Sequence, residues 1–400
     1  MRVAVVHEWL ETYAGSERTL EQILLAFPEA ELFCLVDFLP DKDRHFLRGK
    51  TPRTSFIQKL PFARRRFRSY LPLFPMAVEQ FDLSSFDIVI SNSHAVAKGV
   101  TVGPRQFHVS HCCSPMRYAW DLRDEYLREA NLTKGVKGAI ARAILHYLRI
   151  WDAATTGSVD EFVAISHFVA ARIRKFYGRS SVVVYPPVDV SSFTPREQKE
   201  DFYLAASRQV PYKRIDVIVE AFRRMPHRRL VVIGDGPQAA KIQKIAAGCP
   251  NIQLLGYQPF SVLKDHMQRA RAFLFAAKED FGIIVLEAQA CGTPVIAYGE
   301  GGALETVVSA GPARTGLFFD EQTPEAIMET VERFESERAS FRPQACRANA
   351  EQFAPEVFRS LVENFVREKY AIYRSTVDGE RLYPVFQPEA AIAQDNIRHG

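Results

Sequence analysis

Residues 272–298 read AFLFAAKEDFGIIVLEAQACGTPVIAY, and the fold can be worked out from this stretch. Two apolar runs, 272–277 and 294–298, have the length and composition of buried strands. Between them, a turn that contains Gly282 leads into a helical pattern over 283–291. A strand, a helix and a second strand in this order predict a βαβ unit with both strands in one parallel sheet.

The same alternation extends over most of the chain. Further strand-like apolar runs stand at 201–206, 229–234, 252–256 and 316–319, and in the first half at 2–7, 31–36, 86–91, 107–110, 162–166 and 181–185. Strands that alternate with helices indicate parallel sheets covered on both faces. The stretch 186–201, rich in proline, serine and charge, is typical of a linker. We therefore predict Rossmann-like domains over 1–190 and 191–370, with a helix end and tail over 371–400 that we expect to cross back to the first domain.

Composition restricts the function classes. The 400 residues are 47% apolar and 24% charged, as in ordinary globular enzymes, and the net charge of +4 is too small to indicate a nucleic-acid partner. No apolar run reaches the roughly 18 residues that a membrane span needs. The first strand meets Glu8 too early for a signal peptide, so we expect a cytoplasmic protein. The six cysteines form no C-x-x-C pair, and reduced, mostly buried thiols are expected.

Acidic residues stand where the strand 272–277 ends, and ligands of doubly wound sheets bind beyond the carboxyl ends of strands. The following helix begins with unpaired backbone N–H groups and a partial positive charge, which suit an anion. We expect Phe281, Gly282 and Ile283 to face that anion. Glu279 precedes the helix and Glu287 lies within it, so the two carboxylates can reach different parts of one ligand.

This stretch resembles the E-x7-E motif of retaining glycosyltransferases of family 4, which have the GT-B fold of two Rossmann-like domains facing across a cleft. The resemblance implies that Glu279 contacts the donor sugar and that Glu287 holds the ribose of its nucleotide. Spacing alone would leave a solvated helix with two surface acids as an equal alternative. The flanking FG at 281–282 and CGTPVIA at 291–297 favour the family.

A basic loop, SRQVPYKRID at 207–216, directly follows the strand-like run 201–206. Departure of a nucleoside diphosphate develops negative charge, which a guanidinium and an ammonium can stabilise without a metal. The loop resembles the Arg-x4-Lys loop of the family, which implies that Arg208 and Lys213 grip the diphosphate. An ordinary basic loop is the alternative.

Two glycine-containing turns are less specific. HEWLETYAGSERTL at 7–20 is not the G-x-G-x-x-G loop of nicotinamide enzymes, and the resemblance implies that Gly15 faces the diphosphate. A simple turn glycine is the alternative there. IGDGP at 233–237 matches the family's GDGP turn, in which we interpret Gly234 as mainly structural. The family often contacts the base at the position of Tyr257.

The run HVSHCCSPMRYAWD at 108–121 resembles a subgroup similar to GDP-mannose-dependent mannosyltransferases of surface polysaccharide assembly. The resemblance places Arg117 at the donor. The family's cleft histidine falls on Cys113, whereas His111 occupies the usual tyrosine position. We expect His111 to take over the sugar contact, with a structural histidine as the alternative.

The segment 53–70 combines six cations with six large apolar side chains. A basic helix that carries aromatic residues can lie on an anionic membrane surface. Lipid-linked acceptors are common in the subgroup, so we expect peripheral attachment to the inner face of the cell membrane through this segment. A solvated basic face or an RNA-like patch is the alternative.

Together these features predict a metal-independent enzyme that needs no cofactor. It would transfer a hexosyl group, mannose or a relative, from a GDP-sugar to a glycan or a polyprenyl-diphosphate-linked acceptor. Two rivals remain open. A nucleotide-sugar 2-epimerase on the same fold would leave the basic segment unexplained, and a non-catalytic nucleotide-sugar binding module would not need both glutamates and both cations.

Overall fold

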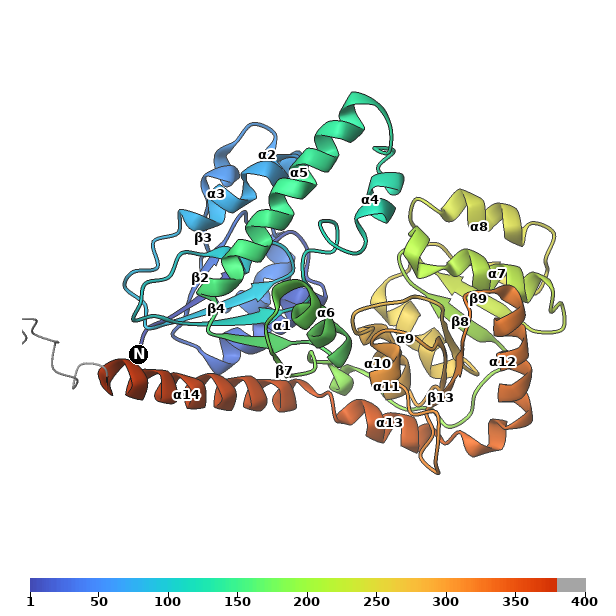
Figure 1. Cartoon of the computed structure of the whole chain (residues 1–400). Helices are drawn as coiled ribbons and strands as arrows, with labels where there is room; N and C mark the ends of the chain where they lie inside the picture. The colour runs from blue at the N-terminus through green and yellow to red at the C-terminus, as the bar shows by residue number, and fades with distance from the viewer. Residues whose placement is uncertain (380–400) are drawn as a thin grey trace, which may run out of the picture.

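The computed structural model describes residues 1–379 and contains two parallel sheets, each covered by helices (Figure 1). The first sheet has the strand order β3-β2-β1-β4-β5-β6-β7. Its strands are β1 (Val3–His7), β2 (Glu31–Cys34), β3 (Arg53–Thr54), β4 (Ile88–Ser93), β5 (Phe107–Cys112), β6 (Glu161–Ala164) and β7 (Val182–Val183). All of its strand pairs run parallel, which confirms the doubly wound architecture for the first half.

The second sheet has the order β10-β9-β8-β11-β12-β13 and is also parallel throughout. Its strands are β8 (Tyr203–Ala206), β9 (Leu230–Ile233), β10 (Ile252–Leu254), β11 (Phe273–Phe275), β12 (Val295–Tyr298) and β13 (Gly316–Phe319). The βαβ unit predicted from residues 272–298 is present as β11, α10 and β12, with Phe273 paired to Val295.

The helices of the first half are α1 (Gly15–Ala26), α2 (Ala63–Arg66), α3 (Phe74–Glu79), α4 (Arg123–Glu129), α5 (Gly135–Ala154) and α6 (His167–Tyr177). Those of the second half are α7 (Ile215–Arg223), α8 (Ala239–Ala246), α9 (Phe260–Arg269), α10 (Ile283–Ala290), α11 (Ala303–Thr306), α12 (Pro324–Ser336), α13 (Pro343–Glu351) and α14 (Pro355–Gly379). Short 3-10 turns are η1 (Asp41–Leu47), η2 (Phe56–Lys59), η3 (Phe67–Leu73), η4 (Ala97–Gly99), η5 (Thr155–Ser158), η6 (Val190–Ser192), η7 (Pro211–Lys213) and η8 (Arg338–Ser340).

Helix α14 returns from the second half to the first and runs along the N-terminal sheet (Figure 1). Phe358, Val362 and Val366 of this helix are buried in the cluster formed by α1 and one face of that sheet. Burial of such side chains stabilises the docking by roughly 1.5–3 kcal/mol each. The end of the chain therefore holds the two halves together.

The segment 53–70 is not the single amphipathic helix that its composition predicts. It runs through β3, η2, α2 and the start of η3. Pro61 has no backbone N–H to donate, and Phe62 has a left-handed backbone with φ of 57°, so a continuous helix is interrupted between η2 and α2. Two of the apolar side chains of this segment, Ile57 and Phe67, are buried in the core of the domain and are not displayed on a free helix face.

Candidate functional site

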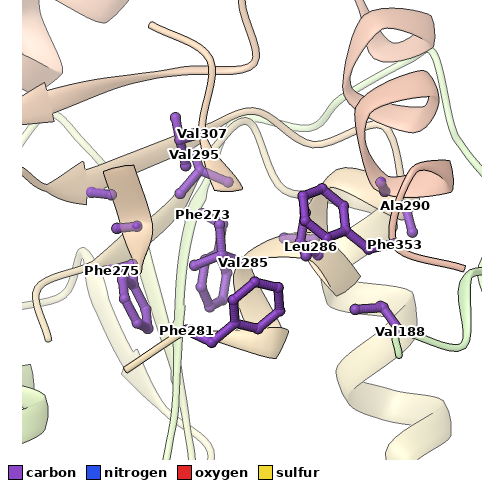
Figure 2. Close-up of a cluster of buried hydrophobic side chains, with 14 of the residues drawn as sticks. Val188, Phe273, Phe275, Phe281, Val285, Leu286, Ala290, Val295, Val307 and Phe353 are labelled. Carbon is purple, nitrogen blue, oxygen red and sulfur yellow. The ribbon is translucent and has the colours of Figure 1, made fainter. Parts of the chain in front are cut away.

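Helix α10 begins at the carboxyl end of the second sheet, where Gly282 supplies a left-handed N-cap with φ of 88°. Phe281, just before it, is buried among Val285 of the same helix and Phe353 (Figure 2). The Phe281 side chain therefore anchors the helix start, and only its backbone can face a ligand. Gly282 and Ile283 line the cleft, as the sequence predicts, and present the positive end of the helix to it.

Two predicted side chains meet in front of this helix. Glu279 follows β11 and is fixed by a parallel bridge to Gly301, whereas Lys213 ends the turn η7 after β8. Their ammonium and carboxylate groups form an ion pair. Arg208 lines the same cavity, of about 650 Å³. The loop after β8 and the turn between β11 and α10 are far apart in the sequence. Together they bring two cations, Arg208 and Lys213, and the carboxylate of Glu279 to the same cavity.

Opposing influences act on the Lys213 ammonium. Burial, with Arg117 and Arg208 as neighbouring cations, lowers the pKa of Lys213 to about 7. The carboxylate of Glu279 against it acts in the opposite direction, because an opposite charge favours the protonated form. We regard the paired lysine as charged, and an anionic ligand in the cleft would hold its proton more firmly still.

The N-terminal domain contributes the opposite wall of the cleft. Gly15, at the start of α1, lies so close to Ile283 that an added Cβ would stand 3.3 Å from its Cδ1 atom. Glycine therefore permits close approach of the two domains here, and Gly15 does line the cleft. One turn further along α1, Arg18 donates a 2.6 Å hydrogen bond from Nη1 to Oε1 of the buried Glu287.

The Arg18–Glu287 ion pair was not predicted, because Arg18 carries no local pattern that distinguishes it from any arginine on a helix. Only the apposition of α1 and α10 reveals its partner. Glu287 is thus held in place from across the cleft, at the side of the cavity where the sequence predicts a ribose contact.

His111 does not line the cleft, which contradicts the expected sugar contact. It lies within β5, is buried, and packs edge-on against Phe358 of α14. Its Nδ1 is 3.0 Å from Oδ1 of Asn92, and burial lowers its pKa to about 4. This placement agrees with the structural alternative, because α14, whose docking could not be predicted from the sequence, packs against this part of the strand.

Cys113 and His94 occupy the cleft wall instead. Cys113 comes one residue after β5 ends, so its side chain can turn toward the cavity. His94 packs against Trp9 with ring centroids 4.7 Å apart. The buried carboxylate of Glu8 accepts hydrogen bonds from the backbone N–H groups of 94–97 and so fixes this loop. Sequence patterns gave no reason to single out His94.

Arg117 lies at the junction of this cavity with a second one of about 1000 Å³. Its Nε is 3.5 Å from Oδ2 of Asp280, and Arg172 of α6 is 2.9 Å from the other oxygen of the same carboxylate. The second cavity is lined by both domains, including Glu125 and Glu129 of α4. These two cavities, the first and second compartments of the cleft, are both lined by Arg117, Tyr212 and Asp280.

Gly234 and Tyr257 are not among the described residues that line either cavity. At Gly234, which has φ of 129°, an added Cβ would stand 1.9 Å from the carbonyl oxygen of Ser207. The glycine thus allows close packing against the loop that leads to Arg208, which agrees with a mainly structural role. The Tyr257 side chain is exposed.

Two further searches cover residues 1–379. Within this range no group of three or more His, Cys, Asp and Glu side chains is placed to hold a metal ion. In the same range, no helix has the length and apolar content to cross a membrane.

Comparisons with known proteins agree with the two-domain fold. The family model described as Glycosyltransferase Family 4 matches residues 13–192, and that described as Glycosyl transferases group 1 matches 190–353. A GDP-mannose-dependent alpha-(1-6)-phosphatidylinositol monomannoside mannosyltransferase of Mycolicibacterium smegmatis is 28% identical over 43% of this chain and 52% of its own length. A D-inositol 3-phosphate glycosyltransferase of Mycobacteroides abscessus is 31% identical over 41% of this chain and 39% of its own. The chain thus spans about half the length, or less, of these relatives.

Solved structures share the fold over nearly the whole chain. Sucrose-phosphate synthase from Thermosynechococcus elongatus superimposes with a TM-score of 0.67 at 17% identity, covering 93% of this chain and all of that one. Anabaena HepE in complex with UDP gives a TM-score of 0.64 at 14% identity and covers 92% of this chain and all of its own. At such identities the likeness concerns the fold alone.

Proposed function

The chain belongs to the GT-B glycosyltransferases of family 4, and from that premise we propose that it transfers a hexosyl group, with retention, from a nucleotide diphosphate sugar. One observation carries the proposal: Lys213 and Arg208 meet Glu279 at the N-terminal end of α10. Two cations and a helix N-terminus suit a diphosphate, and the carboxylate suits sugar hydroxyls.

The Lys213 ammonium is paired with the Glu279 carboxylate. A bound diphosphate would carry more negative charge than the single carboxylate of Glu279 and would therefore attract Lys213 more strongly. Glu279 would then be released to accept hydrogen bonds from the sugar.

In the reaction, the bond between the anomeric carbon and the diphosphate oxygen breaks, and negative charge grows on the leaving group. Arg208, Lys213 and the N–H groups at the start of α10 stabilise that charge. The acceptor oxygen forms its bond on the same face of the sugar, and its proton passes to an oxygen of the departing diphosphate. No side chain of this chain is required as a base.

The second compartment, lined by α4 and by the C-terminal domain, is the space we assign to the acceptor. A glycan or a polyprenyl-diphosphate-linked sugar would reach the donor past Arg117 and Asp280. We place the reaction at the inner face of the cell membrane, in the synthesis of surface polysaccharide. We base the proposed donor and acceptor on the resemblance of the sequence to the subgroup. The curated relatives are matched over only part of their length and do not by themselves identify these substrates.

The donor should be a GDP-sugar, because the runs 108–121 and 162–189 resemble the GDP-mannose-dependent subgroup. A ligand that binds only the folded state raises the melting temperature according to its occupancy. We expect GDP and GDP-mannose to raise it and UDP to leave it unchanged at equal concentration. A shift with UDP and none with GDP would refute the GDP assignment while leaving the fold and the cleft unaffected.

Transfer should persist in excess EDTA, because Arg208 and Lys213 supply the positive charge that a metal would otherwise bring. Initial rates with and without chelator, after removal of divalent ions, provide the measurement. Loss of turnover that magnesium or manganese restores would contradict this mechanism. A run without acceptor in the same series tests for epimerisation, which would convert the sugar of the donor without consuming an acceptor.

A further inference from the structure

Helix α5 has one face in the core and a second apolar face in solvent. Leu145 and Leu148 are buried in the cluster beneath it. On the other side, at spacings that keep one helix face, four large apolar side chains stand out: Val136, Ile140, Tyr147 and Ile150 are 76%, 55%, 47% and 57% exposed. An exposed apolar stripe of this length marks an interaction surface.

The charges that α5 itself carries beside the stripe have one sign, and one carboxylate from another helix, that of Glu79 on α3, accepts a 2.6 Å hydrogen bond from Trp151 near the end of α5. Between residues 130 and 151 the chain contains no Asp or Glu, whereas five basic residues are present: Lys134, Lys137, Arg142, His146 and Arg149. The first acid after them, Asp152, is buried and paired with Lys98 at 3.0 Å. Of the three acids of the preceding helix, Glu125 and Glu129 line the second compartment of the cleft, and the exposed Asp124 is paired with Arg123 at 2.9 Å.

A second basic surface covers the same side of the domain. The segment 53–70 packs through Ile57 and Phe67 onto the cluster that receives Leu145 and Leu148 of α5. It displays Phe62, which is 78% exposed, next to three exposed arginines at 64–66. Helix α14 lies on the opposite face of the sheet (Figure 1).

We propose that the outer face of α5 is a lipid-binding surface, whose apolar stripe inserts into an anionic bilayer while its basic flanks contact the headgroups. The charge pattern selects this occupant. A basic helix with an apolar face gains from both terms at an anionic interface, whereas a second copy of the chain would bring like charges together.

This surface goes beyond the proposed attachment through 53–70. Its four apolar side chains can enter the bilayer, whereas the arginines at 64–66 can only contact the headgroups. It also has a consequence for the cleft that rests on the proposed transfer reaction. Helix α4 leads directly into α5 and lines the second compartment. Binding through α5 would therefore hold that compartment beside the bilayer, where a lipid-linked acceptor resides.

The test is co-sedimentation of the full chain with vesicles of phosphatidylglycerol and phosphatidylcholine, compared with pure phosphatidylcholine. The double variant Ile140→Glu/Tyr147→Glu should bind anionic vesicles on the order of tenfold more weakly, since two charges must enter the interface. The matched control is Ile372→Glu on α14, because Ile372 is 53% exposed and lies on the other face. It should bind as the unmodified chain does.

Unchanged binding by the double variant, or an equal loss in Ile372→Glu, would overturn the proposal. Sedimentation velocity without lipid is the second arm. A dimer that the double variant dissociates would show that the occupant is another copy of the chain. Thermal unfolding and GDP-sugar binding check that the variant is folded, and the milder Ile140→Ser/Tyr147→Ser replaces it if it is not.

A third variant, Arg64→Ser/Arg65→Ser/Arg66→Ser, tests the attachment through 53–70 separately. Its binding should fall and should lose part of its salt dependence, because these arginines act through charge. If the triple variant binds normally while the α5 variant does not, the earlier proposal fails and the α5 surface remains. Rates with a soluble acceptor report on the transfer reaction independently of both.

Discussion

Replacing Lys213 with Ala should lower turnover by about 10²–10³, because loss of one preorganised donor to a developing charge typically costs that much. The leaving diphosphate carries more charge in the transition state than in the bound donor. The loss should therefore fall more on kcat than on donor affinity. Initial rates over a range of donor concentrations, beside calorimetric donor binding, separate the two effects.

The control for this variant is Lys244→Ala, which removes an exposed lysine of α8 that does not line the described cavities. It should behave as the unmodified enzyme does. The ion pair with Glu279 introduces one complication, because Lys213→Ala also leaves that carboxylate without its cation. Lys213→Arg keeps the charge and should retain more activity than the alanine variant. If Lys213→Ala, Lys213→Arg and Lys244→Ala all turn over as fast as the unmodified enzyme, the reaction takes place elsewhere.

Replacing Glu279 and Glu287 one at a time with Gln should have different effects on the binding of the intact donor and of free nucleoside diphosphate. Glu279→Gln keeps the side-chain size but weakens hydrogen bonds to the sugar, so it should impair transfer and binding of the intact donor. Free nucleoside diphosphate has no sugar and should bind nearly as before. Glu287→Gln should weaken the free diphosphate as well, through the ribose. A hydrogen bond to a charged group contributes about 1.5–3 kcal/mol, or roughly 10- to 100-fold in affinity.

Calorimetry with donor and with diphosphate on each folded variant is the measurement, and Glu329→Gln on the exposed side of α12 is the control. The ion pair of Glu287 with Arg18 adds a further expectation. Arg18→Gln should weaken diphosphate binding in the same direction as Glu287→Gln, because it releases the carboxylate from its position. If the Glu279 and Glu287 variants give the same ligand pattern, the division of roles between sugar and ribose is wrong.

Sequence patterns were sufficient for the architecture. Buried parallel strands are short, apolar and separated by helices, so their periodicity located twelve of the strands within a few residues. The two-residue strand β3 was missed, because two residues at a sheet edge produce no periodicity. Glu279, Lys213 and Gly15 were indicated by resemblance to the motifs of the family, and the position of each after a strand agrees with that, because ligands of such sheets bind beyond the carboxyl ends of the strands.

Contacts between elements that are distant in the chain were decided only by the tertiary structure. His111 reads as a cleft residue until α14, more than 240 positions later, is seen to pack against its strand. Arg18 has no distinguishing pattern until α1 faces α10 across the cleft. The exposure of the apolar outer face of α5 can likewise be seen only in the folded chain, where Val136, Ile140, Tyr147 and Ile150 remain exposed. Periodicity records that a side chain is apolar or charged, but its partner depends on how the layers dock, and docking is a property of the whole chain.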